Sequence, residues 1–247
     1  MGFLDFSGRR IMVIGASSGI GQAAAVLLSQ LGAELVLVGR NEKGLSQTMA
    51  LLHNSPHHRA APYDVTDLER SSALFDMAVE DGKKLDGLVY CAGIARPVPL
   101  RAISQASFTD IFSVNYFGFI QMVQRYAQRK YNNGGSIIGV SAVNAHYPQK
   151  CMTLYSASKA AIESSVSTLA LELGQQGIRI NSVIPGAVDT PMARDTEPAA
   201  LASIVSKQML GMQKPEDIAN IIAFLLSERA STITGRNIFV DGGMLGQ

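Results

Sequence analysis

The sequence predicts a single α/β domain built around a parallel sheet, and two observations carry that prediction. Short apolar runs rich in Val and Ile alternate with helical patterns along the chain, as expected for strands that are buried on both faces. The repeated strand–helix–strand order calls for parallel strands joined by right-handed crossovers. A length of 247 residues suits one large domain, 1–247, with a substantial core.

Seven apolar runs are candidate strands, and six stretches between them are candidate helices. The expected strands cover 11–14, 35–38, 60–63, 88–90, 136–140, 179–183 and 237–240. The expected helices cover 21–31, 42–52, 67–80, 105–130, 155–174 and 215–227. The segment 187–212 does not fit the alternation. Because it follows a parallel strand and is long, we expect it to form a substrate lid.

Composition and charge argue against several functions. A net charge of +1 without a basic tail disfavours a nucleic-acid partner, and no apolar stretch reaches the ~20 residues of a membrane span. Cys91 and Cys151 make no disulfide framework, which predicts a cytoplasmic location. His53, His57 and His58 lack acidic or Cys partners at ligand spacing, so we expect a polar loop there and no metal site.

A glycine-rich segment, Gly15-Ala16-Ser17-Ser18-Gly19-Ile20-Gly21, follows the first expected strand. Glycines let the backbone approach a pyrophosphate, and the helix that follows offers free amides and the positive end of its dipole. The spacing is G-x-x-x-G-x-G and differs from the G-x-G-x-x-G of the common dinucleotide fingerprint. Its place between a strand and an amphipathic helix predicts a dinucleotide site.

The end of the second expected strand indicates which dinucleotide is bound. An acidic residue there would accept hydrogen bonds from the adenosine ribose and select NAD. Arg40 stands there instead, and a guanidinium pairs well with a 2′-phosphate, so we expect NADP. Ser17 and Ser18 would add hydroxyl contacts, whereas the alternative for Arg40 is a solvated side chain. Asp64 would either accept the adenine amino group or close a turn before Asp67.

Tyr155 and Lys159 are the candidate acid–base pair. A spacing of four places both side chains on one face of a helix. A phenol titrates at about pH 10, and an ammonium one turn away favours the phenolate and lowers that pKa. A tyrosine tuned in this way exchanges a proton with a carbonyl oxygen.

With these residues in place, the chain resembles the short-chain dehydrogenase/reductase family over nearly its whole length. The family's motifs occur here in the family's order, as Gly15-x-x-x-Gly19-x-Gly21, Asp64-Val65, Ala92-Gly93, Asn115, Tyr155-x-x-x-Lys159, Pro185-Gly186 and Val240-Asp241-Gly242-Gly243. The resemblance implies a doubly wound, seven-stranded parallel sheet of the Rossmann type with helices on both faces. It also implies a homodimer or homotetramer, and within the family the chain looks most like 3-oxoacyl-acyl-carrier-protein reductases.

The resemblance further implies a role for individual residues. Tyr155 is the proton donor, Lys159 lowers its pKa and holds the nicotinamide ribose, and Asn115 holds a water for proton relay. The residues expected to frame the nicotinamide and phosphates are Pro185, Gly186, Val188 and Thr190. The remaining expected cofactor contacts are Gly15, Ser17, Ser18, Gly19, Ile20, Gly21, Arg40, Asp64, Val65, Ala92 and Gly93.

Two positions depart from the family's pattern. Cys91 stands where the family has Asn, and we expect a buried small residue there and no nucleophile. The family's catalytic Ser lies thirteen residues before the Tyr, a position that Ala142 holds here, with Ser141 beside it. Adjacent strand residues point to opposite faces. Ser141 therefore needs a one-residue bulge or loop change to act as the catalytic hydroxyl.

If Ser141 does not reach the site, the hydroxyl donor to the substrate is either missing or replaced. Candidates for the replacement are Asn144, His146 and Thr153 in the next loop. Loss of such a donor commonly lowers the rate ~100-fold.

The sequence therefore predicts an NADP(H)-dependent reductase that transfers hydride to a ketone or 3-oxoacyl-type carbonyl. The expected substrate wall is apolar and includes Ile94, Pro97, Val98, Val143, Met152, Met192 and Met209. One alternative is an NAD-dependent alcohol dehydrogenase of the same family, which Arg40 disfavours. The other is a catalytically weak NADP-binding sensor or scaffold, an alternative that Ala142 motivates.

Overall fold

The computed structural model describes residues 3–53 and 56–244, and the rest of the 1–247 span lies outside the described residues. Seven strands form one sheet in the order β3-β2-β1-β4-β5-β6-β7, with every neighbouring pair parallel. The strands are β1 (Arg10–Ile14), β2 (Glu34–Gly39), β3 (Arg59–Pro62), β4 (Leu85–Tyr90), β5 (Asn132–Val140), β6 (Ile178–Pro185) and β7 (Asn237–Val240). The predicted parallel seven-stranded sheet is thus confirmed.

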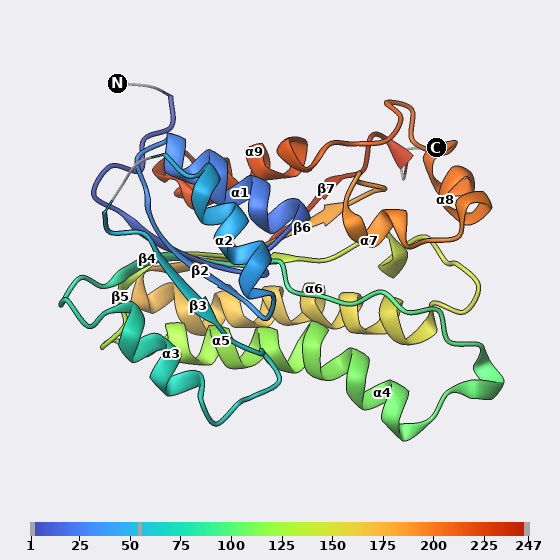
Figure 1. Ribbon diagram of the computed structural model, residues 1–247, viewed down its shortest axis with the longest axis horizontal. Coiled ribbons are helices and arrows are strands. Elements are labelled where there is room, and N and C mark those ends of the chain that lie inside the picture. Colours follow the sequence, from blue (N-terminus) through green and yellow to red (C-terminus); the bar gives the residue numbers. More distant parts are fainter. Residues whose placement is uncertain (1–2, 54–55, 245–247) are drawn as a thin grey trace.

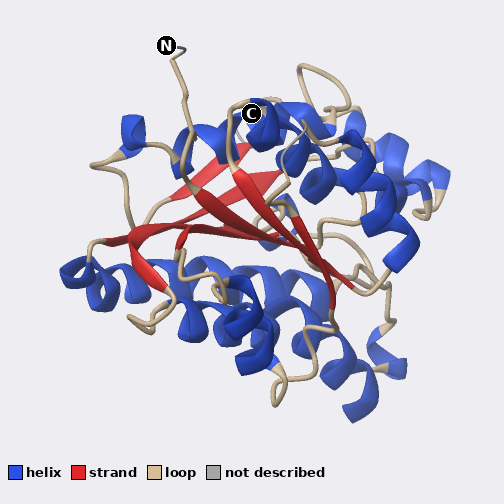
Figure 2. Ribbon diagram, turned by 60° about the vertical axis from the view of Figure 1, so that its left-hand side comes forward, coloured by secondary structure: helices blue, strands red, loops and turns tan. Residues whose placement is uncertain are grey.

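Helices cover both faces of the sheet, as Figures 1 and 2 show. One layer contains α1 (Gly19–Gln30), α2 (Glu42–Leu51) and α9 (Pro215–Leu226). The opposite layer contains α3 (Ser71–Ala78), α4 (Gln105–Phe112), α5 (Gly118–Tyr126) and α6 (Thr153–Leu173). Two shorter helices, α7 (Pro191–Arg194) and α8 (Pro198–Val205), lie in the segment 187–212. Short 3₁₀ turns occupy Leu100–Ala102, Val143–Ala145, Gly174–Gln176 and Glu228–Ala230.

Alternation along the strands divides the core into two apolar layers. Met12 and Ile14 of β1 belong to the cluster that packs against α3, α5 and α6, whereas Ile11 and Val13 belong to the cluster against α1 and α9. Successive strand side chains point to opposite faces, so a strand covered by helices on both sides must be apolar at every position. The four apolar residues Ile11–Ile14 of β1 are accordingly all buried.

The strand order places a crevice at the carboxyl ends of two central strands, β1 and β4. The chain runs outward from β1 to β3 in one direction and then returns to add β4 on the other side of β1. The loops that leave the carboxyl ends of β1 and β4 therefore diverge, and ligands bind at such a switch point in open α/β sheets.

One expected helix is interrupted. The span 105–130 consists of α4, a π-helical turn at Ser113–Phe117 and α5, and the amide of Gly118 donates to the carbonyl of Ser113 across this turn. Isolated π turns are rare and occur frequently at functional sites. A π turn contains one residue more than an α-helical turn. The hydrophobic pattern of 105–130 does not reveal this residue, because α4 and α5 pack in the same layer.

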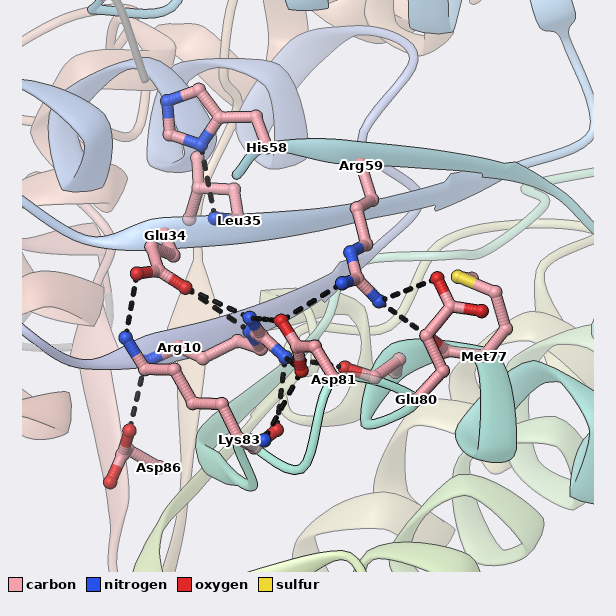
Figure 3. Close-up of polar contacts among 11 residues, drawn as sticks. Arg10, Glu34, Leu35, His58, Arg59, Met77, Glu80, Asp81, Lys83 and Asp86 are labelled. Carbon is pink, nitrogen blue, oxygen red and sulfur yellow. Dashed lines mark hydrogen bonds and ion pairs between the residues drawn. The ribbon is translucent and has the colours of Figure 1, made fainter. Parts of the chain in front are cut away.

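An ionic cluster lies at the amino end of β1 (Figure 3). The guanidinium of Arg10 is 2.6 Å from Asp81 and 3.0 Å from Glu34, and it also donates to the backbone carbonyls of Ala78 and Lys83. Its side chain is only 1% exposed. Arg10 thus ties β1 to β2 and to the turn that follows α3. Because a buried guanidinium needs its partners, we interpret this cluster as structural.

Candidate active site

A cavity of about 620 Å³ opens at the carboxyl ends of β1, β4, β5 and β6. All the site residues predicted from the sequence line it except Asp64 and Asn115. Residues of α7 and α8 line its other side, among them Met192, Ala200, Leu201 and Ile204. The switch point of the sheet and the segment 187–212 thus enclose one continuous space.

The glycine loop lies tightly against its neighbours. Gly15 has a φ of +84°, and a Cβ there would be 2.7 Å from the amide nitrogen of Ala92 after β4. A Cβ on Gly19 would be 3.1 Å from the methyl carbon of Thr190, after β6. Ser18, the residue before α1, makes no side-chain capping bond to the helix. The first-turn amides of α1 therefore point to the cavity edge without a side-chain cap, which suits a pyrophosphate.

Arg40 stands at the rim where β2 ends. Its side chain is 60% exposed, and Nη1 is 3.4 Å from Asp64 Oδ2. The other carboxylate oxygen of Asp64 accepts from the amide and hydroxyl of Thr66, so Asp64 closes a turn. Burial opposes ionisation of Asp64, but the Thr66 bonds and Arg40 hold its pKa below the usual value. Arg40 keeps an exposed guanidinium at the cavity, and these side chains fit a dinucleotide.

Tyr155 and Lys159 lie in the first two turns of α6, with side chains that are buried at the cavity wall. Lys159 Nζ donates to the carbonyl oxygen of Val140 at 2.8 Å and is 5.9 Å from the centre of the Tyr155 ring. Burial lowers the pKa of Lys159 to about 8, against the opposing effects of Cys91 and Glu163. Lys159 is therefore mostly an ammonium at neutral pH and loses its proton as the pH rises through about 8.

The expected lowering of the Tyr155 pKa does not occur in the chain alone. Burial raises the pKa of Tyr155 to about 12. The ammonium of Lys159 points to Val140 rather than to the phenol oxygen, so it does not offset the cost of burying a phenolate. Tyr155 is consequently protonated at neutral pH, the state that a proton donor needs.

Asn115 lies in the π-helical turn and is fully buried. Its Oδ1 accepts from the amide of Ile94 at 2.8 Å, and its Nδ2 donates to the carbonyl of Ile94 and to Ser158 Oγ on α6. A Cβ on Gly93 would be 3.3 Å from Lys159 Nζ and 3.4 Å from Asn115 Oδ1. Asn115 therefore joins the loop after β4 to α6 beside Lys159, just behind the cavity wall.

Ser141 lines the cavity, but its hydroxyl is bonded to α6, and the bulge that was one of the two alternatives for this residue is absent from the end of β5. The register of β5 with β6 continues through Val140, and the amide of Ser141 donates to Val183 at 2.8 Å, so no bulge rotates it. The Ser141 hydroxyl is 2.5 Å from Glu163 Oε1 on α6 and 3.1 Å from the carbonyl of Lys159. A carboxylate partner of this kind holds the hydroxyl in place.

Ala142 occupies the place beside the tyrosine and packs against Tyr155 and Met152. Of the three candidate replacements, Asn144 lines the cavity, and Thr153 lines only a smaller neighbouring hollow. His146 Nε2 is 2.6 Å from Glu163 Oε2 and is thus held by the same carboxylate as Ser141. Position 142 thus carries no hydroxyl, and the Ser141 hydroxyl is bonded to Glu163 and to the carbonyl of Lys159.

Comparison with known proteins gives the family. A family model described as Enoyl-(Acyl carrier protein) reductase matches residues 15–245. The 3-oxoacyl-(acyl-carrier-protein) reductase of Thermotoga maritima is 33% identical over 248 residues, which cover 98% of this chain and 100% of that protein. The chain belongs to the short-chain dehydrogenase/reductase family. Its members are oxidoreductases that use a nicotinamide cofactor, NAD or NADP, in agreement with the cavity described above.

Solved structures of this family superpose closely on the chain. A short-chain type dehydrogenase/reductase from Mycobacterium ulcerans has a TM-score of 0.90 at 31% identity, covering 99% of this chain and 92% of that one. A 7α-hydroxysteroid dehydrogenase, solved with NADH and 7-oxo glycochenodeoxycholic acid, has a TM-score of 0.89 at 30% identity, covering 97% and 95%. The resemblance inferred from the motifs and the doubly wound fold are both confirmed.

Several residues of the cavity had no signal in the sequence. The Val140 carbonyl, the Gln149 side chain and Lys150 come from the end of β5 and the loop after it. Among the expected apolar wall residues, Pro97, Val143, Met152 and Met192 line the cavity. Ile94 and Val98 instead pack in a small cluster with Ile111 and Leu154, and Met209 is largely exposed. A hydrophobic loop residue alone does not reveal whether it faces a cavity or the core.

Cys91 lines the cavity, and burial raises the pKa of its thiol to about 12, so the thiol remains protonated. Within residues 3–53 and 56–244, no cluster of three His, Cys, Asp or Glu side chains is placed to hold a metal. None of the helices in these ranges has the length and apolar character needed to cross a membrane.

Proposed function

We propose that the chain is an NADP(H)-dependent reductase that transfers hydride to the carbonyl carbon of a ketone or 3-oxoacyl-type substrate. One observation carries the proposal. Tyr155 and Lys159 lie buried on the wall of the same cavity that the glycine loop and Arg40 border. A proton donor and a dinucleotide site thus share one enclosed space.

Arg40 supports NADP over NAD. It stands at the end of β2 with an exposed guanidinium, where an acidic residue would favour the ribose hydroxyls of NAD. The neighbouring Asn41 accepts from the amide of Gly44 and is thereby used as the cap of α2. Ser17 lines the cavity next to Arg40 and offers a hydroxyl. A planar guanidinium with a hydroxyl beside it suits a 2′-phosphate.

The chain's own residues move the proton. The glycine loop and Pro185–Thr190 would hold the cofactor, which would supply the hydride. Tyr155, which burial keeps protonated, gives its proton to the carbonyl oxygen. The Lys159 ammonium donates to the Val140 carbonyl and is 5.9 Å from the centre of the Tyr155 ring. We assign to Lys159 a move from that carbonyl toward the phenol oxygen, where its charge would stabilise the phenolate that this step leaves. We assign to Asn115 the water that restores the proton, because Asn115 lies beside Lys159 behind Gly93.

The cavity wall supports an apolar substrate. The apolar side chains that line it are Ala95, Pro97, Val143, Met152, Met192, Leu201 and Ile204. The charged lining residues on this side, Lys150, Asp195 and Glu197, are exposed. An alicyclic or acyl-chain ketone fits such a wall better than a sugar does. We also propose that 187–212 acts as the lid, because α7 and α8 contribute a large part of this wall.

We also propose that the chain forms a homodimer or homotetramer and is cytoplasmic. Phe108 and Phe117 expose aromatic rings on α4 and the π-helical turn, and Leu171 is 81% exposed on α6. These helices adjoin, and their exposed apolar groups support a homodimer or homotetramer that covers them. Two cysteines that are unpaired in the structure support a cytoplasmic enzyme.

The deciding experiment measures reduction of a ketone panel with NADPH and, separately, with NADH. The panel contains cyclic ketones, aliphatic ketones and a 3-oxoacyl thioester. We expect turnover with NADPH, and we expect Tyr155→Phe to lower the rate ~10²- to 10⁴-fold without weakening cofactor binding. A preference for NADH would instead favour the NAD-dependent dehydrogenase. Tight NADPH binding without reduction of any ketone would favour the sensor or scaffold.

A further inference from the structure

The acid–base pair lacks the neighbouring hydroxyl donor that a carbonyl oxygen would use. Ala142 packs its methyl group against Tyr155, and the Ser141 hydroxyl is held by Glu163. During hydride transfer the electron pair of the C=O π bond moves to oxygen, so negative charge builds there before the Tyr155 proton arrives. A second hydrogen-bond donor at that oxygen lowers the barrier.

Gln149 offers such a donor. Its Nε2 is the one side-chain nitrogen or oxygen in the described part of the chain that is buried without a hydrogen-bond partner. Gln149 lines the same cavity as Tyr155 and Ala142. Buried polar groups are almost always paired in proteins, so an unpaired amide at a cavity calls for an explanation. A substrate oxygen in the cavity would pair it.

The loop that carries Gln149 is held in a fixed and strained conformation. The carbonyl of Gln149 accepts from the amide of Met152, and the carbonyl of Cys151 accepts from Val98 at 2.7 Å. Cys151 has a φ of +65°, a left-handed conformation that is uncommon outside glycine. Strained backbone of this kind occurs preferentially at ligand sites. Met152 in turn packs on Tyr155 and Ala142, which links the loop directly to the acid–base pair.

The other polar residues of this loop are weaker candidates. His146 is bonded to Glu163, and Thr153 lines only the neighbouring hollow. Asn144 lines the cavity, but none of its side-chain atoms is both buried and unpartnered. Among these polar residues, Gln149 is therefore the one whose side chain has a buried donor without a hydrogen-bond partner.

We propose that the side-chain amide of Gln149 donates a hydrogen bond to the carbonyl oxygen of the ketone, in place of the missing hydroxyl. This inference rests on the reductase function proposed above. Hydride from the cofactor adds to the carbonyl carbon, the π electrons pass to oxygen, and oxygen takes the Tyr155 proton. Gln149 stabilises the charge on oxygen and transfers no proton itself.

The test is single-turnover hydride transfer from NADPH in Gln149→Leu. Gln175→Leu is the matched control, because Gln175 is an exposed glutamine outside the cavity lining. We expect Gln149→Leu to slow hydride transfer ~100-fold with every ketone that the wild type reduces. NADPH affinity should not change. The thermal midpoint should stay equal or rise, because the substitution removes an unpaired buried amide. Gln175→Leu should leave the transfer rate close to that of the wild type.

Two further variants separate a hydrogen bond from a packing effect. Ala142→Ser in the Gln149→Leu background returns a donor beside Tyr155, and we expect it to recover much of the lost rate. Gln149→Glu keeps the size but loses the donor when ionised, so its rate should rise as the pH falls and the carboxyl becomes protonated. A rate that neither variant restores would overturn the assignment in favour of packing.

The outcomes distinguish this inference from the function on which it rests. If wild type reduces ketones and Gln149→Leu reduces them equally fast, Gln149 is not the donor and the reductase function stands. A loss confined to ketones that carry a second polar group would also overturn the carbonyl assignment. If wild type transfers hydride to no ketone, the proposed function fails and this inference fails with it.

Discussion

Lys159 Nζ donates to the carbonyl oxygen of Val140 at 2.8 Å, which ties α6 to the end of β5. The bond places the ammonium 5.9 Å from the centre of the Tyr155 ring, inside the cavity wall. Burial of this charge is costly, and it lowers the pKa of Lys159 to about 8. The same burial raises the pKa of Tyr155 to about 12. As the pH rises, Lys159 therefore loses its proton before Tyr155 does, whereas the sequence predicts a lowered pKa for Tyr155.

The pH dependence of reduction follows from these shifts. Below pH 8, Lys159 is an ammonium and Tyr155 is a phenol, the states that stabilise a phenolate and donate a proton. We expect kcat/KM for ketone reduction to fall with loss of one proton as the pH rises through about 8. Lys159→Arg keeps its charge to much higher pH and should remove this fall, at a lower absolute rate. A wild-type rate that stays constant well above pH 8 would contradict the assignment.

The same shift of Lys159 affects stability with a definite sign. Its pKa in the folded chain is below the ordinary value of 10.5, so the unfolded chain binds more protons between about 8 and 10.5. The destabilisation from burying the ammonium is complete below pH 8 and disappears as the pH rises through this window. We expect Lys159→Met to increase the free energy of unfolding at pH 7, and the gain to shrink toward pH 10. Denaturant titrations at the two pH values measure it.

Arg40 is predicted to control the choice of cofactor. A charge-assisted bond to a 2′-phosphate contributes ~1.5–3 kcal/mol, so Arg40→Ala should weaken NADPH binding ~10- to 100-fold. NADH has no 2′-phosphate, and its affinity should change little. Arg96, also exposed and paired with an aspartate but not part of the cavity lining, gives the matched control Arg96→Ala. Calorimetric titration of both cofactors compares the variants, and equal losses for NADPH and NADH would remove Arg40 as the selector.

The sheet and its order of elements were predictable because buried parallel strands leave a strong apolar pattern, as in Ile11–Ile14 of β1. The glycine loop, Tyr155 and Lys159 were found for a similar reason, since their spacing reflects backbone geometry. The π-helical turn around Asn115 was missed because it changes no residue type. Gln149 was missed because its burial depends on a loop path, including the left-handed Cys151, that no periodicity encodes.

The role of Ser141 could not be predicted from the sequence either. Its position next to Ala142 left open whether the hydroxyl serves the site, and the sequence does not reveal that this hydroxyl is bonded to Glu163 and to the Lys159 carbonyl. In the structure it supplies one of the hydrogen bonds to the buried carboxylate of Glu163, and His146 supplies another. These bonds predict that Ser141 contributes to stability and not to hydride transfer.

Ser141→Ala tests this division. The substitution removes a donor from a buried carboxylate, which should cost ~1.5–3 kcal/mol in the free energy of unfolding. Hydride transfer should be unchanged under conditions where the variant is folded, because Glu163 and the Lys159 carbonyl engage the hydroxyl. Chemical denaturation and single-turnover kinetics on one preparation give both values. A large loss of hydride transfer with unchanged stability would restore Ser141 as the catalytic hydroxyl.

Two adjacent arginines at the amino end of β1 are expected to contribute differently to the free energy of unfolding. Arg10 is 1% exposed and bonds Asp81 and Glu34, whereas Arg9 is 31% exposed and pairs with Glu228, itself 71% exposed. The Arg10 bond is the largest influence on Asp81 and holds its pKa well below the usual value. The stability from this pair is therefore present above the ordinary carboxyl pKa of 3.8 and lost as the pH falls through the lowered value.

Arg10→Met should lower the free energy of unfolding by ~3 kcal/mol, the lower end for breaking a buried pair, because Asp81 and Glu34 retain some contact with water. Arg9→Met should cost less than ~1 kcal/mol, as exposed pairs do. Urea denaturation at neutral pH measures both, and the difference between Arg10→Met and wild type should shrink on acidification as Asp81 becomes protonated. Cofactor affinity should be the same in both variants, because neither arginine lines the cavity. Equal stability losses for the two substitutions would show that burial of Arg10 adds nothing to its ion pairs.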